Sequence, residues 1–403
     1  MIAHFVDCHE NYGDLLYPIV FEKMLRKMQV KEEIRQFSFL EGDAPLQAGY
    51  YVYPIQSLFD RSSEPPKTLV IGGGALFKIN QNKEEGYLEL FKKRGIPLPL
   101  FFNARQWFFR KLGKTGYGSY FNRFFRSRYI NYPAVGHYII NSDDLPGKTS
   151  VVYCSCGGKS GFPPPARKPI KSAFDRASFI YVRNEIVRKG LLNCGVEKYI
   201  HAAPDLIVVL SDFFAPDVEA RKGREILVRE GVDVKRRVLV FQSFPMNNLA
   251  TTQIVEQLKL YSQRKEAEIV LIPLGYCHGD REYLQHLMHL SEGTFKYIPV
   301  NSIFDAISVI AASDVFFGTS MHGNITAFSF NKPFLIAPTK RPKQAGFLNI
   351  ANLDAALELK EWSQANDFLD MAESLETSYF ANRLSEAKTK VYQVFTKLHE
   401  SIK

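Results

Sequence analysis

Short apolar runs alternate with stretches of helical periodicity along most of this chain. Runs typical of buried strands occur at residues 2–6, 68–71, 179–182, 207–210, 237–242, 268–273, 314–317 and 333–337. Apolar positions with helical spacing occur at residues 15–28, 254–261, 280–290, 303–312, 324–330 and 382–398. Strands that alternate with helices form βαβ units. The pattern therefore predicts an α/β fold with parallel sheets covered by helices.

The length of 403 residues exceeds what one ordinary core organises, so two domains are expected. A charged, proline-containing connector at residues 211–223 marks the boundary. We predict two Rossmann-like domains whose parallel sheets face a cleft. The first spans residues 1–210 and the second residues 224–381, with a final helix at 382–403 packing back on the first. Ligands of open α/β sheets bind beyond the carboxyl ends of strands, so functional residues are expected in the loops that follow strands.

Charge narrows the choice of partners. The chain has 51 Lys and Arg against 42 Asp and Glu, a net charge of +9. Such a surface favours phosphorylated metabolites, lipid-linked pyrophosphates or an anionic membrane face, or it is a solubilising surplus with no specific target. Nothing resembles a nucleic-acid-binding module, so no nucleic acid is expected as a partner.

Cysteine usage and the amino terminus indicate a cytoplasmic protein. The 5 cysteines are scattered and odd in number, which argues against a disulfide framework and favours buried, reduced thiols. Cys154 and Cys156 stand too close for the usual zinc spacing, and no metal site is expected. The first residues look like a strand rather than a signal peptide, and no apolar window is long enough to span a membrane.

One segment departs from the alternating pattern. Residues 101–132 are dense in aromatic and basic residues and nearly devoid of acidic ones. Such a stretch is typical of a peripheral contact with the inner membrane face or with a lipid-linked acceptor. The alternative is an insertion whose aromatic side chains pack on the domain while its cations reach solvent.

Two glycine-containing segments follow strands in the first half. Asn11-Tyr-Gly-Asp14 joins the first strand to the first helix. Gly13 allows a tight turn there, and Asp14 can cap the helix. The amino end of the helix could then bind an anion, or the segment could be a capping turn that binds no ligand. Gly72, Gly73 and Gly74 come directly after a strand, so a small anion or a sugar could lie against their backbone. The run is not a dinucleotide fingerprint, which makes that interpretation weak.

Two further segments carry candidate chemistry. Arg183 leaves the end of a strand, where a guanidinium can grip a carboxylate or phosphate, or simply pair on the surface with Glu185 or a neighbouring acid. Asp205 enters the next predicted strand and is interpreted as a structural residue at a turn or between domains. The strand at 314–317 leads into a polar loop that holds Ser320 and His322, with a helix starting near Asn324. Lys340, Arg341 and Lys343 follow the next strand and add cations at the same sheet edge.

In this order, these segments resemble the polysaccharide pyruvyl transferase family. The family pattern begins with Asn-x-Gly-Asp, here residues 11–14, and continues with three glycines, here 72–74. A strand followed by Arg-Asp/Asn-Glu comes next, here 183–185, and then Pro-Asp, here 204–205. It closes on a Gly-containing segment that ends in His, here 318–322. Each motif is loose alone, and their joint order is specific; the poorest fit is at residues 101–132.

The resemblance implies a GT-B-like fold, phosphoenolpyruvate as co-substrate without any other cofactor, and a sugar acceptor in a capsular or other exopolysaccharide precursor, whether lipid-linked or not. It assigns the handling of the pyruvyl group to Arg183 and His322. Arg183 would hold the donor and His322 would be the general acid, because an imidazole can deliver a proton at neutral pH. At Ser320 many members have arginine instead. Either Lys340, Arg341 or Lys343 grips the donor here, or the donor or the activity differs.

Two other functions remain open from the sequence. One is a GT-B glycosyltransferase that uses a nucleotide sugar, which binding of that donor without phosphoenolpyruvate would favour. The other is a non-catalytic sugar- or anion-binding homologue, in which Ser320 marks lost chemistry. Donor binding without phosphate release would identify it.

Overall fold

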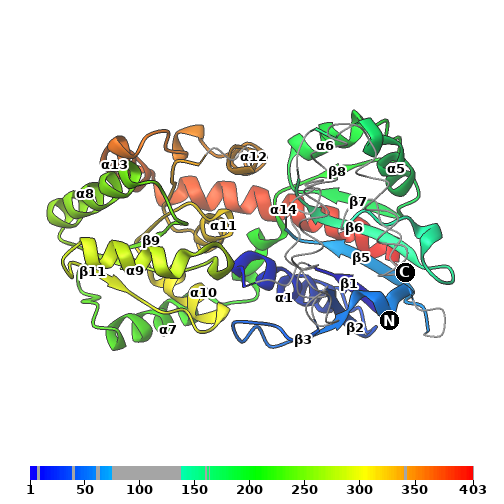
Figure 1. Ribbon diagram of the computed structural model, residues 1–403, viewed down its shortest axis with the longest axis horizontal. Coiled ribbons are helices and arrows are strands. Elements are labelled where there is room, and N and C mark those ends of the chain that lie inside the picture. The colour runs from blue at the N-terminus through cyan, green and yellow to red at the C-terminus, as the bar shows by residue number, and fades with distance from the viewer. Residues whose placement is uncertain are drawn as a thin grey trace, which may run out of the picture.

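The computed structural model describes residues 1–6, 10–38, 41–59, 64–74, 138–158, 161–162, 164–339 and 343–402. Two α/β units lie side by side, each built around one sheet (Figure 1). Residues 340 and 341 and the aromatic, basic stretch at 101–132 lie outside the described residues.

The first unit has an eight-stranded sheet in the order β3-β4-β2-β1-β5-β6-β7-β8, and only its β3–β4 pair is antiparallel. Its central strands are buried on both faces, which explains their continuous apolar sequences. The strands are β1 (Ile2–Phe5), β2 (Ile34–Ser38), β3 (Gly42–Asp43), β4 (Tyr51–Pro54), β5 (Thr68–Gly72), β6 (Ser150–Cys156), β7 (Phe179–Val182) and β8 (His201–Ala202), and the helices are α1 (Tyr12–Lys27), α5 (Pro164–Asp175) and α6 (Glu185–Leu192).

The second unit has a five-stranded, wholly parallel sheet in the order β11-β10-β9-β12-β13. Its strands are β9 (Arg237–Gln242), β10 (Ala267–Leu271), β11 (Phe295–Tyr297), β12 (Val315–Gly318) and β13 (Phe334–Ile336). The helices of this half are α7 (Pro216–Arg229), α8 (Asn248–Lys265), α9 (Asp280–Leu290), α10 (Ile303–Ala312), α11 (Met321–Ser329), α12 (Lys343–Ile350), α13 (Ala365–Ser374) and α14 (Thr377–Ile402). The predicted α/β fold with two Rossmann-like domains and parallel sheets is confirmed.

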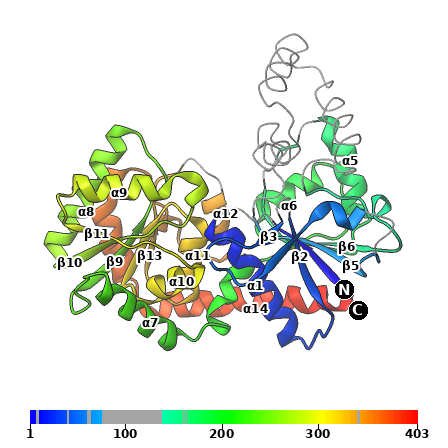
Figure 2. The same ribbon diagram turned by 60° about the horizontal axis from the view of Figure 1, so that its bottom comes forward.

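The last helix, α14, connects the two units. It runs from the second unit back to the first, and the two chain ends lie close together in both views (Figures 1 and 2). Along its course it contacts α11 of the second unit and β7 of the first. The connector predicted at 211–223 is partly helical, because α7 begins at Pro216 and proline is favoured in the first turn of a helix.

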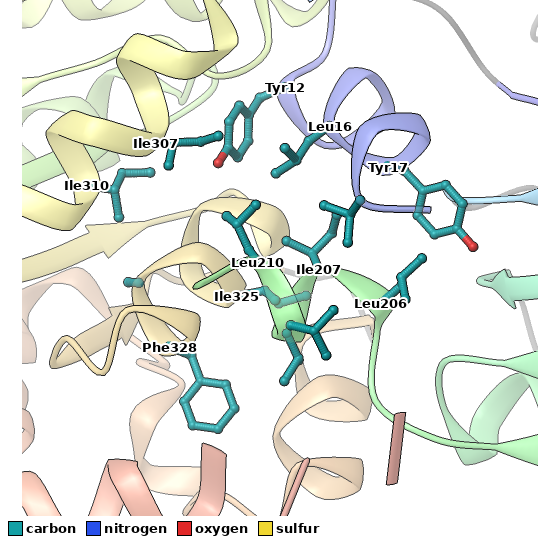
Figure 3. Close-up of a cluster of buried hydrophobic side chains, with 14 of the residues drawn as sticks. Tyr12, Leu16, Tyr17, Leu206, Ile207, Leu210, Ile307, Ile310, Ile325 and Phe328 are labelled. Carbon is teal, nitrogen blue, oxygen red and sulfur yellow. The ribbon is translucent and has the colours of Figure 1, made fainter. Parts of the chain in front are cut away.

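One strand prediction is wrong. Residues 207–210 belong to a 3₁₀ helix, η3 (Leu206–Asp212), instead of a strand. Asp205 starts this helix, because its Oδ1 accepts a hydrogen bond from the backbone N–H of Ile207 at 3.0 Å. The apolar residues of η3 are completely buried between α1, α11 and α14 (Figure 3). An apolar run surrounded on all sides has no periodicity that could separate a strand from a helix.

Candidate functional site

Arg183, Asp205 and His322 meet in a buried cluster between the two units. Nη1 of Arg183 donates to Oδ2 of Asp205 at 2.8 Å and lies 3.2 Å from Nε2 of His322. Nε2 of His322 lies 3.7 Å from the same Oδ2. The side chains are 4%, 3% and 10% exposed, so their charges interact with little screening by water. A guanidinium, a carboxylate and an imidazole from distant segments are thus held in direct contact.

The local structure explains how each side chain reaches the cluster. Arg183 follows the carboxyl end of β7 directly, and Asp205 precedes η3. His322 is the second residue of α11, which starts directly after β12. The predicted polar loop around His322 is therefore wrong: the helix begins at Met321 instead of near Asn324, because Ser320 caps it by accepting from the N–H of Gly323 at 3.2 Å.

Two glycines make room for the cluster. A β-carbon at Gly13 would lie 1.6 Å from Nδ1 of His322, so the imidazole packs on the bare backbone of α1. A β-carbon at Gly157 would lie 2.3 Å from Nε and 2.5 Å from Nη2 of Arg183. Any other residue at these two positions requires the imidazole or the guanidinium to move.

The start of α1 ties the first unit to the second. Asn11, rather than the predicted Asp14, caps the helix, and its Oδ1 accepts from the N–H of Gly13 at 3.1 Å. The N–H of Tyr12 donates to the carbonyl of Leu274 at 2.8 Å, and its hydroxyl contacts that of Thr326 at 2.9 Å. Nδ2 of Asn11 also lies 3.4 Å from Nε2 of His278. These contacts hold Gly13, on whose backbone the imidazole of His322 packs, at a fixed place between the units.

The amino end of α11 is fixed by a second network. Oε1 of Gln242 accepts from the N–H of Ser320 at 2.7 Å, and Nε2 of Gln242 donates to Asp280 at 2.6 Å. The buried Asn324 donates to the carbonyls of Gly318 and Ser320 at 3.0 and 2.8 Å. Ser320 and Asn324, predicted as ligand-binding residues, therefore shape the turn that presents His322.

The three-glycine run packs on an aromatic side chain. β-Carbons at Gly72 and Gly73 would lie 2.8 and 2.6 Å from the ring of Tyr17, whose hydroxyl donates to the carbonyl of Cys154 at 2.7 Å. The carbonyl of Gly74 accepts from the N–H of Gly157 at 3.0 Å, which connects this run to the glycine that makes room for Arg183. Gly73 and Gly74 have φ values of 74° and 68°, which favour glycine.

Of the three predicted cations after β13, only Lys343 is described, at the first position of α12. Its neighbour Gln344 is buried and donates to the carbonyl of Thr319 at 2.9 Å. Contact between α12 and α6, where Gly346 approaches Asn184, brings the start of α12 toward the Arg183 side of the interface.

Asp205 is the only carboxylate that contacts Arg183 and His322 among the described residues. Burial by itself would raise its pKa, but the His322 imidazole, the Arg183 charge and the Ile207 N–H together hold the pKa of this carboxyl well below its usual range. Burial raises the pKa of the nearby Cys154 thiol to about 12 and also raises the pKa of the Tyr181 hydroxyl. Cys154 and Tyr181 are therefore neutral beside the three ionisable groups.

Sequence reasoning assigned Arg183 and His322 to the site but not their partners. It interpreted Asp205 as structural, yet its carboxylate lies within the cluster. The surface alternative for Arg183 is wrong, because this side chain is buried and Glu185 pairs with Arg188 instead. Gly157 is not among the residues predicted for the site, although it directly follows a strand, as Arg183 does.

The described residues contain neither a metal-ligand cluster nor a membrane-spanning helix. No group of three or more His, Cys, Asp or Glu side chains there could hold a metal ion. No helix in those ranges has the length and apolar composition needed to cross a bilayer. Cys154, Cys156 and Cys194 are buried free thiols as predicted, whereas Cys277 is exposed.

Solved structures with the same architecture include a glycosyltransferase and a UDP-GlcNAc 2-epimerase. The Anabaena protein HepE, in complex with UDP and glucose, is 12% identical with a TM-score of 0.53, over 100% of this chain and 99% of that one. A glycosyltransferase from Rickettsia africae is 11% identical with a TM-score of 0.56, over 100% and 98%. The UDP-GlcNAc 2-epimerase of Methanocaldococcus jannaschii is 10% identical with a TM-score of 0.52, over 93% of each chain. These similarities define the GT-B fold.

The sequence gives the narrower class. Residues 11–339 match the model of the polysaccharide pyruvyl transferase family. The matched region holds the Asn11–Gly13 turn, Arg183, Asp205 and His322. The chain belongs to this family. No curated protein matches it.

Proposed function

We propose that this protein transfers a pyruvyl group from phosphoenolpyruvate to hydroxyls of a sugar in a capsular or other surface polysaccharide precursor, lipid-linked or free. Membership of the family supports the class of reaction. The single observation that carries the residue assignment is the 3.2 Å contact between Nη1 of Arg183 and Nε2 of His322. It places a permanent cation beside a proton-carrying ring, as a carboxylated, phosphorylated enol substrate requires.

Arg183 is proposed to hold the donor through the edge that Asp205 does not use. Nη1 is already hydrogen-bonded, whereas Nε is buried and has no hydrogen-bond partner among the described residues. A buried donor atom without a partner is costly. A carboxylate or phosphate that accepts from Nε and Nη2 would satisfy it in a fork of two bonds. Both nitrogens of this edge lie against Gly157, where a β-carbon would come within 2.3 Å of Nε and 2.5 Å of Nη2.

His322 is proposed as the general acid. A sugar hydroxyl oxygen forms a bond to the enol carbon of the donor and loses its proton to solvent, while His322 protonates the terminal methylene carbon. A second hydroxyl of the same sugar then displaces phosphate, which leaves as inorganic phosphate and takes up the proton of that hydroxyl, and a cyclic ketal remains. The Arg183 charge stabilises the anionic groups of the donor throughout, and the sugar must be oriented by groups close to His322. Lys340, Arg341 and Lys343 remain candidates for further contacts with the donor anions.

The first test is donor binding, which needs no acceptor. Calorimetric titration with phosphoenolpyruvate is expected to show binding to the wild type and to the control Arg229→Ala, an exposed arginine on α7, and much weaker binding to Arg183→Ala. Binding of a nucleotide sugar without phosphoenolpyruvate would instead identify a glycosyltransferase. Binding of neither donor would contradict the proposal.

The second test is release of inorganic phosphate from phosphoenolpyruvate with a panel of lipid-linked and soluble glycans. Acceptor-dependent release is expected to fall by about 100-fold or more in His322→Ala. His289→Ala is the matched control, because His289 lies exposed in the last turn of α9. Unchanged release from His322→Ala would exclude His322 as the acid. Donor binding without release from any acceptor would favour a non-catalytic homologue.

A further inference from the structure

Arg183 and Asp205 impose opposite demands on the same ring nitrogen of His322. Both act at Nε2, with Nη1 of Arg183 at 3.2 Å and Oδ2 of Asp205 at 3.7 Å. A guanidinium has only N–H donors, so a hydrogen bond to it requires a lone pair on Nε2. A carboxylate has only acceptors, so a hydrogen bond to it requires a hydrogen on Nε2.

We infer that Nε2 is the atom of His322 that takes up and releases the catalytic proton, with Arg183 and Asp205 as positioning residues for its two states. In the neutral ring the hydrogen resides on Nδ1, and Nε2 accepts from Arg183. In the protonated ring Nε2 carries a hydrogen, loses its lone pair, and turns toward Asp205. That this proton takes part in catalysis rests on the proposed function. The positions of the proton follow from the geometry of the cluster.

The contacts of the neighbouring atoms support this assignment. The two hydrogens of Nη1 match its two acceptors, Oδ2 of Asp205 and Nε2 of His322. Asp205 is itself held, because its other oxygen accepts from Ile207 at 3.0 Å. Nδ1 faces the backbone of Gly13, at the place where a β-carbon would lie 1.6 Å away. The Nδ1 side of the ring therefore packs on the α1 backbone, and Nε2 faces the two charged partners.

Few other groups could set the protonation of this ring. Tyr181 and Cys154 border Asp205, and burial raises the pKa of both, so they are neutral. Cys156, near Arg183, has its pKa raised by burial as well. Asp14 on α1, Glu185 on α6 and Lys343 on α12 are the charged residues of the adjoining helix starts. Within the described ranges, the carboxylate in contact with the ring is that of Asp205.

The direction of proton transfer follows. The protonated ring gives its Nε2 hydrogen to the methylene carbon of the donor as the sugar oxygen bonds to the enol carbon and releases its own proton to solvent. The electron pair of the N–H bond stays on Nε2, which then accepts from Nη1 of Arg183. The same guanidinium that holds the donor therefore stabilises the neutral ring that remains. The ring must regain a proton at Nε2 from solvent before the next turnover.

The test is ¹⁵N NMR of histidine-labelled protein without substrate, recorded over the range from about pH 5 to 9 around the ordinary imidazole titration. The signals of His322 are identified by their loss in His322→Gln. The neutral ring is expected to carry its hydrogen on Nδ1 in the wild type. A neutral ring with its hydrogen on Nε2 would overturn the inference, and this result needs no other variant to fold.

The role of Asp205 is tested with Asp205→Asn, which keeps the size of the side chain. Removing the negative charge is expected to move the His322 ¹⁵N signals at a fixed pH toward those of the neutral ring, while the signals of the other histidines stay in place. Unchanged His322 signals would overturn the role given to Asp205. Absence of phosphate release by the wild type would count against the proposed function alone, because the spectra are recorded without donor or acceptor.

Discussion

The imidazole of His322 rests on the backbone of Gly13, where a β-carbon would come within 1.6 Å of Nδ1. Gly13→Ala is therefore expected to displace the ring. Displacement by about 1 Å lowers turnover by about 100-fold when geometry limits the chemistry. Acceptor-dependent phosphate release of the variant checks this expectation.

Gly161→Ala is the matched control, because a β-carbon at Gly161 would meet nothing within 4 Å. Urea unfolding of both variants separates a displaced ring from a lost fold. Full activity in a folded Gly13→Ala protein would show that the position of His322 does not matter for the reaction.

The pH dependence of turnover is expected to depend on Asp205. A general acid must be protonated, so activity is lost as pH rises and His322 gives up its proton. The carboxylate of Asp205 favours the protonated ring at 3.7 Å. In Asp205→Asn the alkaline limb of kcat is therefore expected at lower pH.

Asp143→Asn serves as the control for this measurement, because Asp143 is exposed and forms its ion pair with Arg176 rather than with a residue of the cluster. Its profile should match that of the wild type. A uniform drop of kcat in Asp205→Asn, with the alkaline limb unmoved, would leave Asp205 a purely structural role.

The sequence predicted the architecture because it repeats the same local signal many times. Alternating apolar runs and amphipathic stretches indicated parallel sheets, and the strands at β1, β5, β7 and β9 lie where the runs occur. The prediction was wrong at residues 207–210, where the apolar run is a 3₁₀ helix. Because that segment is buried on all sides, its apolar pattern does not distinguish a helix from a strand. The cap supplied by Asp205 starts it as a helix.

For the site, sequence reasoning was limited by long-range contacts. Arg183 and His322 were chosen because each follows the carboxyl end of a strand, and that local rule placed both at the interface of the two units. Their approach to 3.2 Å depends on how two domains pack, because the two residues are 139 positions apart in the sequence. No local pattern encodes this packing. Only the folded chain shows that Asp205 contacts both side chains and that His322 and Arg183 pack on Gly13 and Gly157. The catalytic roles stay predictions.

A buried histidine outside the site is expected to make stability depend on pH. His4 lies in β1 against Phe21, and burial, opposed in part by the neighbouring Gln36 side chain, lowers its pKa from 6.5 to about 3. Between these values the unfolded chain binds a proton that the folded chain does not, so the free energy of unfolding falls as pH decreases through this window. The loss attributable to His4 should be about 2–3 kcal/mol between pH 7 and pH 4.5.

His4→Phe removes the titrating group and keeps an aromatic ring in the core. Urea unfolding of the wild type and of His4→Phe at both pH values isolates the contribution of His4, because the other ionisable groups are common to both proteins. An equal loss of stability on acidification in the two proteins would show that His4 is protonated in the folded state.

Ser320 occupies a position where it could either bind the donor or only start a helix, and the two roles predict different measurements. Its hydroxyl accepts from the N–H of Gly323 at 3.2 Å, which makes it the cap of α11. Ser320→Ala should then lower the free energy of unfolding by about 1 kcal/mol, whereas Ser320→Thr, which keeps a capping hydroxyl, should change it little. If capping is its whole role, the KM for phosphoenolpyruvate stays within about twofold in both variants, because a loss of 1.4 kcal/mol of binding would raise it about tenfold. A large rise in KM without loss of stability in Ser320→Ala would place the hydroxyl on the donor. In that case Ser320 would replace the arginine that many family members have at this position.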